Sequence, residues 1–270
     1  MTDAQLVDTH CHLDFERFEA DRDAVIGCAL DAGVVRIVVP AIDLMTARNA
    51  LVLASRYDSV FAAVGIHPNS VPTAAPSPDT GLNELRELAA HPKVVAIGEI
   101  GLDYYWDKTI PVHQQRWLVA QLELAAELAK PVILHNREAT HDLWSTLQKW
   151  VAGGLPEKLQ NRAGVLHSFS ADQPASHLAV EMGFFVGFTG PITYPKADQT
   201  RLVARSVPED RILIETDAPF LAPQRHRGSR NEPAFVKYVA EKVAEVRDIS
   251  FHRAAEITTR NAERLFEFGI

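Results

Sequence analysis

Residues 112–135 read VHQQRWLVAQLELAAELAKPVILH, which is a helical pattern followed directly by an apolar run. In its first part, Leu118 and Leu122, followed by alanines, recur at the spacing of one helix face and predict an amphipathic helix over 112–129. The second part, Pro131 to His135, is a short apolar run that predicts a buried strand. A helix that leads directly into a buried strand is typical of an α/β protein.

The same alternation of strands and helices continues along the chain. Apolar, β-branched runs occur at Leu6–His10, Val34–Pro40, Val60–His67, Val94–Glu99, Pro131–His135, Ala163–His167, Phe184–Phe188 and Arg211–Glu215. A final pair of helices is expected near Glu232–Arg247 and Ser250–Phe268. Strands that are apolar throughout indicate a parallel sheet covered by helices. Eight of them in a chain of this length predict an α/β fold, a single (β/α)8 TIM barrel formed by residues 1–270 as one domain.

An open, doubly wound sheet is the alternative architecture. Its dinucleotide-binding form carries G-x-G-x-x-G in the first βα turn, and this chain has no such motif there. The proline-rich stretch VPTAAPSP at 71–78 is expected to be a surface loop, because the strand and helix pattern continues on both sides. The barrel is therefore the predicted fold.

The composition is that of an ordinary globular protein with an acidic balance. The 27 Lys and Arg against 35 Asp and Glu give a formal net charge of −8, which argues against indiscriminate binding to nucleic acid. Two cysteines, Cys11 and Cys28, are too few for a disulfide framework and suit a reducing compartment. The N-terminus has no apolar signal-peptide core, and no stretch approaches the roughly 20 apolar residues of a membrane span. We therefore expect a cytoplasmic monomer without membrane association.

Histidines and carboxylates gather where the predicted strands end. Five of the 11 histidines and two acidic residues make up this set: His10, His12, His67, Glu99, His135, His167 and Asp217. In a TIM barrel the C-terminal ends of the strands surround one pocket, which holds the active site. Cys11 lies between the first two histidines. Its side chain would point away from theirs in a strand, so a packed thiol is expected, with a ligand role as the alternative.

These residue types in this pattern predict a metal centre. Residues two apart in an extended chain point to one side, so His10 and His12 can bind one ion. A carboxylate such as Glu99 can offer one oxygen to each of two cations, and two metals about 3.5–4 Å apart can activate water and polarise a phosphoryl or carbonyl oxygen. Imidazole suits Zn whereas oxygen donors admit Mg or Mn, so the identity of the ion stays open. Asp8 is expected to orient a histidine ring, while Glu215 is either a salt-bridged structural acid or part of the site.

Ordered motifs along the chain resemble those of a known family. They are DTHCHLDF (8–15), GIHP (65–68), GEIGLDYY (98–105), PVILHNREA (131–139), HSFSAD (167–172), GFTGPITYPKA (187–197), ETDAPFLAP (215–223) and HRGSRNEPAFV (226–236). The set is similar to the segments of the TatD family of metal-dependent deoxyribonucleases. One such segment would be weak, whereas eight in the family's order are highly specific.

The resemblance implies a TIM barrel that binds two divalent metal ions and hydrolyses phosphodiester bonds. By motif, the ligands of one metal are His10 and His12, the bridging carboxylate is Glu99, and the ligands of the second metal are His135 and His167. Asp217 matches an aspartate that binds metal and takes a proton from the attacking water. Family members are associated with hydrolysis of DNA phosphodiesters, including 3′-to-5′ exonuclease activity, with Mg, Mn or Zn. DNA is therefore the expected substrate, and Glu99 and Asp217 are the expected catalytic residues.

Other residues that follow strands are candidates for binding substrate. His67 is expected to contact either a substrate phosphate or a metal. Arg227 and His226, in the loop after the eighth strand, are expected to bind phosphate unless that loop is merely solvated. Tyr104 and the two aromatic residues that follow it either stack on bases or pack their own loop.

Three classes of function remain open from the sequence. The first is a deoxyribonuclease. The second is a hydrolase that acts on an ester or amide with the same centre, such as an aminoacyl-tRNA linkage. The third is a metal-binding protein without catalysis, which the intact set of acids and histidines disfavours. Fold alone does not decide among them.

Overall fold

A computed structural model describes residues 4–72, 78–106 and 109–269, and shows the predicted barrel. Eight parallel strands follow one another around the sheet in the order of the chain. They are β1 (Leu6–Asp8), β2 (Val34–Pro40), β3 (Val60–Val64), β4 (Val94–Asp103), β5 (Val132–Arg137), β6 (Gly164–Leu166), β7 (Phe184–Phe188) and β8 (Ile212–Ile214). Most of the proline-rich stretch at 71–78 lies outside the described residues.

The first and last strands meet and complete the ring, which excludes the open sheet. The amide and the hydroxyl of Thr9 both donate to the carbonyl of Ile214, at 3.3 and 3.0 Å. Just beyond the strands, Cys11 forms a parallel bridge with Ala218. Cys11 is fully buried, as expected for a packed thiol.

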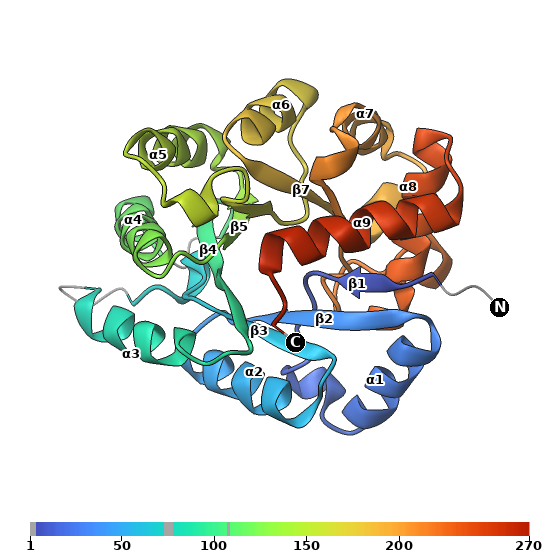
Figure 1. Ribbon diagram of the computed structural model, residues 1–270, viewed down its shortest axis with the longest axis horizontal. Helices are drawn as coiled ribbons and strands as arrows, with labels where there is room; N and C mark the ends of the chain where they lie inside the picture. The colour runs from blue at the N-terminus through green and yellow to red at the C-terminus, as the bar shows by residue number, and fades with distance from the viewer. Residues whose placement is uncertain (1–3, 73–77, 107–108, 270) are drawn as a thin grey trace.

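Helices surround the strands, as Figure 1 shows. They are α1 (Arg22–Asp31), α2 (Leu44–Arg56), α3 (Asp79–Ala89), α4 (Pro111–Glu127), α5 (Thr140–Ala152), α6 (Gln173–Glu181), α7 (Asp198–Ser206), α8 (Val236–Arg247) and α9 (Phe251–Phe266). The helix expected at 112–129 is α4. It starts one residue early, at a proline suited to the first turn, and ends before Ala129, whose φ of 50° is left-handed. None of the described helices is long and apolar enough to cross a membrane.

One end of the barrel is closed by α9. Its apolar face, including Leu265 and Phe266, packs against residues near the starts of the strands, such as Phe61, Phe185 and Leu213. Figure 1 shows α9 crossing this end. Because α9 covers the N-terminal ends of the strands, the opposite end is the one at which the predicted centre can lie.

Glycines let β4 and β5 approach closely on the side of the predicted centre. A Cβ at Gly98 would lie 2.6 Å from Cβ of Ile133. Gly101 has a φ of 147°, and a Cβ there would lie 2.0 Å from the carbonyl oxygen of His135. The register between β4 and β5 also shifts between Ile97 and Ile100. This irregular pairing carries β4 past Glu99, where the sequence predicted its end, to Asp103.

We expect the Gly101→Ala substitution to lower the free energy of unfolding by about 3 kcal/mol, because it adds both backbone strain and a steric overlap. Urea unfolding followed by circular dichroism measures this change. The matched control is Gly27→Ala within α1, where an added Cβ meets nothing within 4 Å and should stabilise the helix by about 0.5–1 kcal/mol. Equal effects of the two substitutions would contradict this account of β4.

Candidate metal centre

The structure brings the predicted histidines and acids together at the end of the barrel opposite α9. Glu99 and His135 lie within β4 and β5, whereas the other residues lie within four residues after the ends of their strands. Three groups have their possible ligand atoms within 4.8 Å of one another: His10, His12 and Glu99; His10, His167 and Asp217; and His67, Glu99 and His135. The predictions for β1 and β3 ran too far, because both strands end before their histidines, at Asp8 and Val64.

Four of these atoms form a compact set with two nitrogens and two oxygens. Nε2 of His10 lies 3.2 Å from Nε2 of His12 and 3.4 Å from Oε2 of Glu99. Nε2 of His12 lies 3.8 Å from the same Glu99 oxygen. Oδ1 of Asp217 lies 3.7 and 3.6 Å from these nitrogens of His10 and His12. Ligands about 2.0–2.1 Å from a tetrahedral ion are about 3.4 Å apart, so the set fits a divalent cation.

The other oxygen of Glu99 faces a different pair of rings. Its Oε1 lies 3.0 Å from Nδ1 of His135 and 3.7 Å from Nε2 of His67. The carboxylate thus presents one oxygen to each of two groups of histidines. This is the placement that a bridging carboxylate requires.

The charges of the centre suit cation binding. Burial alone would raise the pKa of Glu99, yet the nearby rings of His10 and His67 lower it well below its usual range. Burial would also raise the pKa of Asp217, yet the nearby rings of His12 and His167 lower it. Burial and the neighbouring His167 lower the pKa of His10.

His167 is held by Glu215. Nδ1 of His167 lies 2.6 Å from Oε2 of Glu215, whose other oxygen accepts the amide of Ser168 at 3.1 Å. Although burial opposes protonation, the charge of Glu215 raises the pKa of His167 to about 10. A Cβ at Gly187 on β7 would lie 1.6 Å from Oε1 of Glu215, so a glycine there makes room for this carboxylate. The sequence left Glu215 either as a salt-bridged structural acid or as part of the site. Its contact with His167 makes it part of the site.

The contacts of the His167 ring place it in the group that contains His10 and Asp217. It stacks on His10 with 3.4 Å between centroids, and its Nε2 lies 3.7 Å from Oδ1 of Asp217. His135 belongs to the group on the other side of Glu99. That His135 and His167 share a metal therefore stays a prediction.

Asp103 is a residue of the centre that the sequence analysis missed. Its Oδ2 lies 2.9 Å from Nε2 of His135 and accepts a hydrogen bond from Asn69 at 3.1 Å. Burial opposes protonation of His135, but the carboxylates of Asp103 and Glu99 raise its pKa to about 9. The available signal was its place in GEIGLDYY, four residues after Glu99, at the true end of β4.

Asp8 does not have the expected role. Its carboxylate accepts hydrogen bonds from the amide of Thr216 at 2.9 Å, the hydroxyl of Thr216 at 2.6 Å and the amide of His10 at 3.4 Å, rather than from an imidazole. Burial raises its pKa to about 8. These hydrogen bonds from Thr216 to Asp8 join the end of β1 to the chain after β8.

Buried glutamines of α4 fix two of the loops that carry the centre. Gln121 accepts from the amide of Ile66 at 2.7 Å and donates to its carbonyl at 3.1 Å, just before His67. Gln114 does the same for the amide and carbonyl of Asp103, both at 2.8 Å. Both side chains are 1% exposed.

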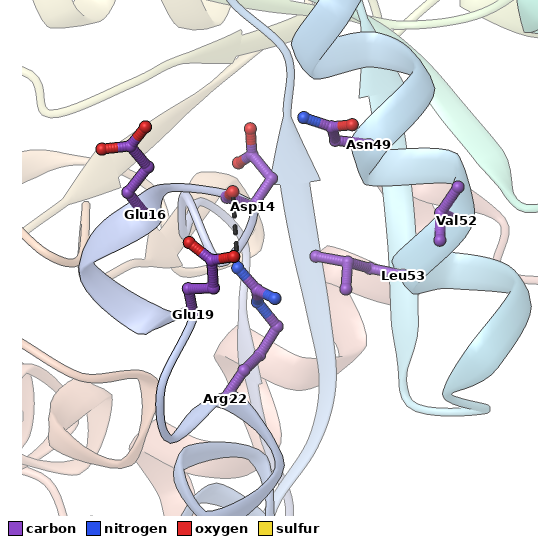
Figure 2. A pocket seen from close by; sticks show the side chains of 7 residues that line it. All are labelled: Asp14, Glu16, Glu19, Arg22, Asn49, Val52 and Leu53. Atoms are coloured by element: carbon purple, nitrogen blue, oxygen red, sulfur yellow. Dashed lines mark hydrogen bonds between the residues drawn. The ribbon is translucent and has the colours of Figure 1, made fainter.

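The segment after His12 is held by Arg22 beside a cavity of about 300 Å³. The guanidinium of Arg22 donates to the carbonyls of Leu13 at 2.7 Å and Asp14 at 3.5 Å. Figure 2 shows Arg22 reaching toward Asp14 on one side of this cavity, with Asn49 of α2 on the other. The cavity does not include the histidines of the centre.

Apart from His67, the predicted substrate-binding residues Tyr104, His226 and Arg227 are not among the three groups of possible ligands. His226 stacks on Phe235 with 4.0 Å between centroids. Arg227 is exposed and its guanidinium lies 4.6 Å from the ring centre of Tyr194. The hydroxyl of Tyr104 donates to Asp142 at 2.8 Å, so this ring packs its loop. Contact of Tyr104, His226 or Arg227 with substrate stays a prediction.

Comparisons with known proteins agree with these motifs. A family model described as TatD related DNase matches residues 7–267. YabD of Bacillus subtilis, named an uncharacterized metal-dependent hydrolase, is 41% identical over 264 residues, which cover 98% of this chain and 100% of that protein. A protein of Musicola paradisiaca named 3′-5′ ssDNA/RNA exonuclease TatD is 34% identical over 270 residues, covering 98% of each chain. The crystal structure of YjjV, a TatD homologue from Escherichia coli, has a TM-score of 0.88 at 34% identity and covers 98% of this chain and 99% of its own.

We expect Glu215→Gln to weaken divalent-metal binding about 10- to 100-fold, because the substitution removes the charge that orients the His167 ring. Titration of the metal-free protein with Zn in the presence of a chromophoric chelator measures the affinity. Glu123→Gln, on the exposed side of α4, is the matched control and should bind as the wild type does. Unchanged affinity in Glu215→Gln would show that the contact with His167 does not support a metal.

Proposed function

The chain belongs to the TatD-related DNase family, and on that premise we propose that it is a metal-dependent hydrolase that shortens DNA from its 3′ end. The observation that carries the proposal is the placement of Glu99, with one carboxylate oxygen facing each of two groups of histidines. The exonuclease polarity rests on the name of the Musicola paradisiaca relative. We also propose that residues 1–270 act as one domain, in the cytoplasm and as a monomer.

Two divalent ions, Mg, Mn or Zn, would be held on either side of Glu99. The residues proposed to hold the first ion are His10, His12, Asp217 and Oε2 of Glu99. From the family motif, His135, His167 and Oε1 of Glu99 are proposed to hold the second ion. Oε1 of Glu99 lies 3.0 Å from Nδ1 of His135, whereas Nε2 of His167 lies 3.7 Å from Oδ1 of Asp217. When bound, such a pair of ions activates water and neutralises the charge that develops on a phosphoryl group.

Asp217 is the carboxylate best placed to accept a proton from the attacking water. Its side chain is 15% exposed, against 4% for Glu99, so it lies on the side of the centre that solvent reaches. Its backbone has a left-handed φ of 57°, and its amide donates to the carbonyl of His10 at 2.8 Å. This strained turn directly after β8 fixes the carboxylate toward His10 and His12.

His67 is proposed to bind a phosphoryl oxygen of the substrate. Its Nδ1 accepts the amide of Asn69 at 3.1 Å, so the proton of the neutral ring resides on Nε2. Nε2 faces the centre, 3.7 Å from Oε1 of Glu99. A nitrogen that carries a proton donates a hydrogen bond and cannot act as a metal ligand, which favours the phosphate role over the metal role.

We expect the wild-type protein, with Mg or Mn, to shorten a 5′-labelled single-stranded DNA oligonucleotide into a ladder that starts at the full length. Glu99→Ala and Asp217→Asn should each slow this cleavage by about 10³-fold or more, because each removes a group proposed to hold metal. Denaturing gels measure the rates, and Glu123→Gln should retain full activity.

Two outcomes would contradict this function. If Mg, Mn and Zn all fail to support cleavage although metal analysis finds bound ions, the deoxyribonuclease proposal is wrong. In that case an ester or amide substrate, such as an aminoacyl-tRNA linkage, becomes the better hypothesis. Shortening that removes the 5′ label first would overturn the proposed polarity.

For His67 we expect loss of activity without loss of metal. His67→Leu removes a hydrogen bond to a charged oxygen and should lower kcat/KM about 10- to 100-fold. His67→Gln keeps a donor near the position of Nε2 and should recover part of that activity. Metal analysis of both variants is the deciding measurement, because loss of bound metal in His67→Leu would identify His67 as a ligand.

A further inference from the structure

Two exposed aromatic rings and an arginine form a cluster at the open end of the barrel. Tyr105 and Trp106, directly after β4, are each 47% exposed. The guanidinium of Arg137, at the end of β5, lies 3.7 Å from the ring centre of Tyr105 and 5.5 Å from that of Trp106. The two rings meet edge to face, with centroids 4.8 Å apart. We refer to Tyr105, Trp106 and Arg137 as the aromatic cluster.

The aromatic cluster is attached to the metal centre by Asp103. Oδ1 of Asp103 accepts the amides of Tyr105 at 3.1 Å and Trp106 at 3.3 Å. Its other oxygen, Oδ2, lies 2.9 Å from Nε2 of His135. One carboxylate therefore sets both the backbone of the two aromatic residues and the orientation of a ring in the centre.

The strand pairing places Arg137 on the same side of the barrel. Arg137 pairs with Asp103 in the parallel register of β4 and β5, and it follows His135 by two residues. The amide of Tyr104 continues this pairing by donating to the carbonyl of Arg137 at 2.9 Å. The aromatic cluster thus lies next to the His135 side of the centre.

The aromatic cluster is far more exposed to solvent than a packed loop requires of its neighbour Tyr104. The neighbouring ring of Tyr104 is tied down through its hydroxyl to Asp142 and Gln115. Tyr105 and Trp106 instead present nearly half of their surfaces to solvent. Large exposed aromatic rings beside an arginine have the chemistry that stacks on nucleobases, by ring stacking and by contact with the planar guanidinium.

We propose that the aromatic cluster is a nucleobase-stacking subsite, which holds an unpaired base of the strand whose phosphate lies at the metal centre. This inference rests on the proposed function and names the residues that would hold a base of the strand. A base inside a duplex is already stacked on its neighbours, whereas an unpaired base can present its face to a ring. The formal net charge of −8 fits this mode, because stacking supplies affinity that a basic surface would otherwise provide.

Steady-state cleavage of single-stranded oligothymidylate tests the subsite. Tyr105→Leu and Trp106→Leu should each raise KM about tenfold while kcat changes less than twofold, because stacking affects binding rather than the reacting groups. Tyr105→Phe keeps the ring and should behave as the wild type does. Tyr57→Leu is the matched control: Arg56 stacks on Tyr57 at 5.1 Å, but this pair precedes β3 at the other end of the barrel.

An oligonucleotide with abasic positions near its 3′ end distinguishes stacking from other causes. The KM of the wild-type protein should be higher for this abasic substrate than for the intact oligonucleotide. Tyr105→Leu should not raise the KM for the abasic substrate any further. If Tyr105→Leu weakens the intact and abasic substrates equally, or leaves KM unchanged on both, the subsite proposal is wrong.

Binding without cleavage separates this proposal from the proposed function. Titration of the wild type with oligothymidylate should quench tryptophan emission, and most of the quenching should be absent in Trp106→Phe. Of the other three tryptophans, Trp117 and Trp144 are buried, and Trp150 packs near Phe184 at the start of β7, at the other end of the barrel. Quenching by Trp106 without any DNA cleavage would overturn the proposed function and support the subsite. Cleavage of DNA without quenching from Trp106 would support the proposed function and overturn the subsite.

Discussion

One ionised carboxylate, held at the end of the barrel by imidazoles on both sides, is the constraint on which the rest of the site depends. Glu99 is 3% exposed, and a buried charge without partners would cost several kcal/mol. The rings that face it come from different parts of the ring of strands: His10 follows β1, and His135 lies in β5. This pairing exists only when the barrel is closed, so the centre and the fold stabilise each other. A divalent cation would complete the same balance of charge.

The rings at Glu99 are themselves held by a second set of polar groups. Asp103 and Glu215 each accept from one histidine and from one or more backbone amides, so each couples a ring to its loop. Gln114 and Gln121 bring main-chain groups of two loops to α4. In metal sites such partners set which nitrogen of a histidine is available, and losing them weakens metal binding. The helices around the barrel therefore contribute to the centre through their buried polar residues as well as through their packing.

Much of this could be predicted from the sequence, because hydrophobic runs mark buried strands and a barrel gathers strand ends at one place. The bounds of β2 and β7 agree with the prediction, and the residues of the ligand set meet at one end. The polar residues that hold the ligand set in place could not be predicted. Asp103 belongs to the centre because β4 continues past a register shift, and periodicity does not show where a shift occurs. Asp8 is expected from the sequence to orient a histidine ring, yet it joins two chain segments 208 residues apart.

The loops show where sequence reasoning stops and why. Tyr104, Tyr105 and Trp106 are adjacent aromatic residues, yet Tyr104 is tied to Asp142, 38 residues away, while its two neighbours are each 47% exposed. His226 similarly owes its position to Phe235. Such contacts depend on how loops fold over the barrel rather than on local pattern. Residues at strand ends are fixed by the sheet, whereas the rim is free to vary, so one centre can serve different substrates as its loops change. Substrate choice in this protein should therefore be sought at the rim, beside the aromatic cluster, rather than among the histidines.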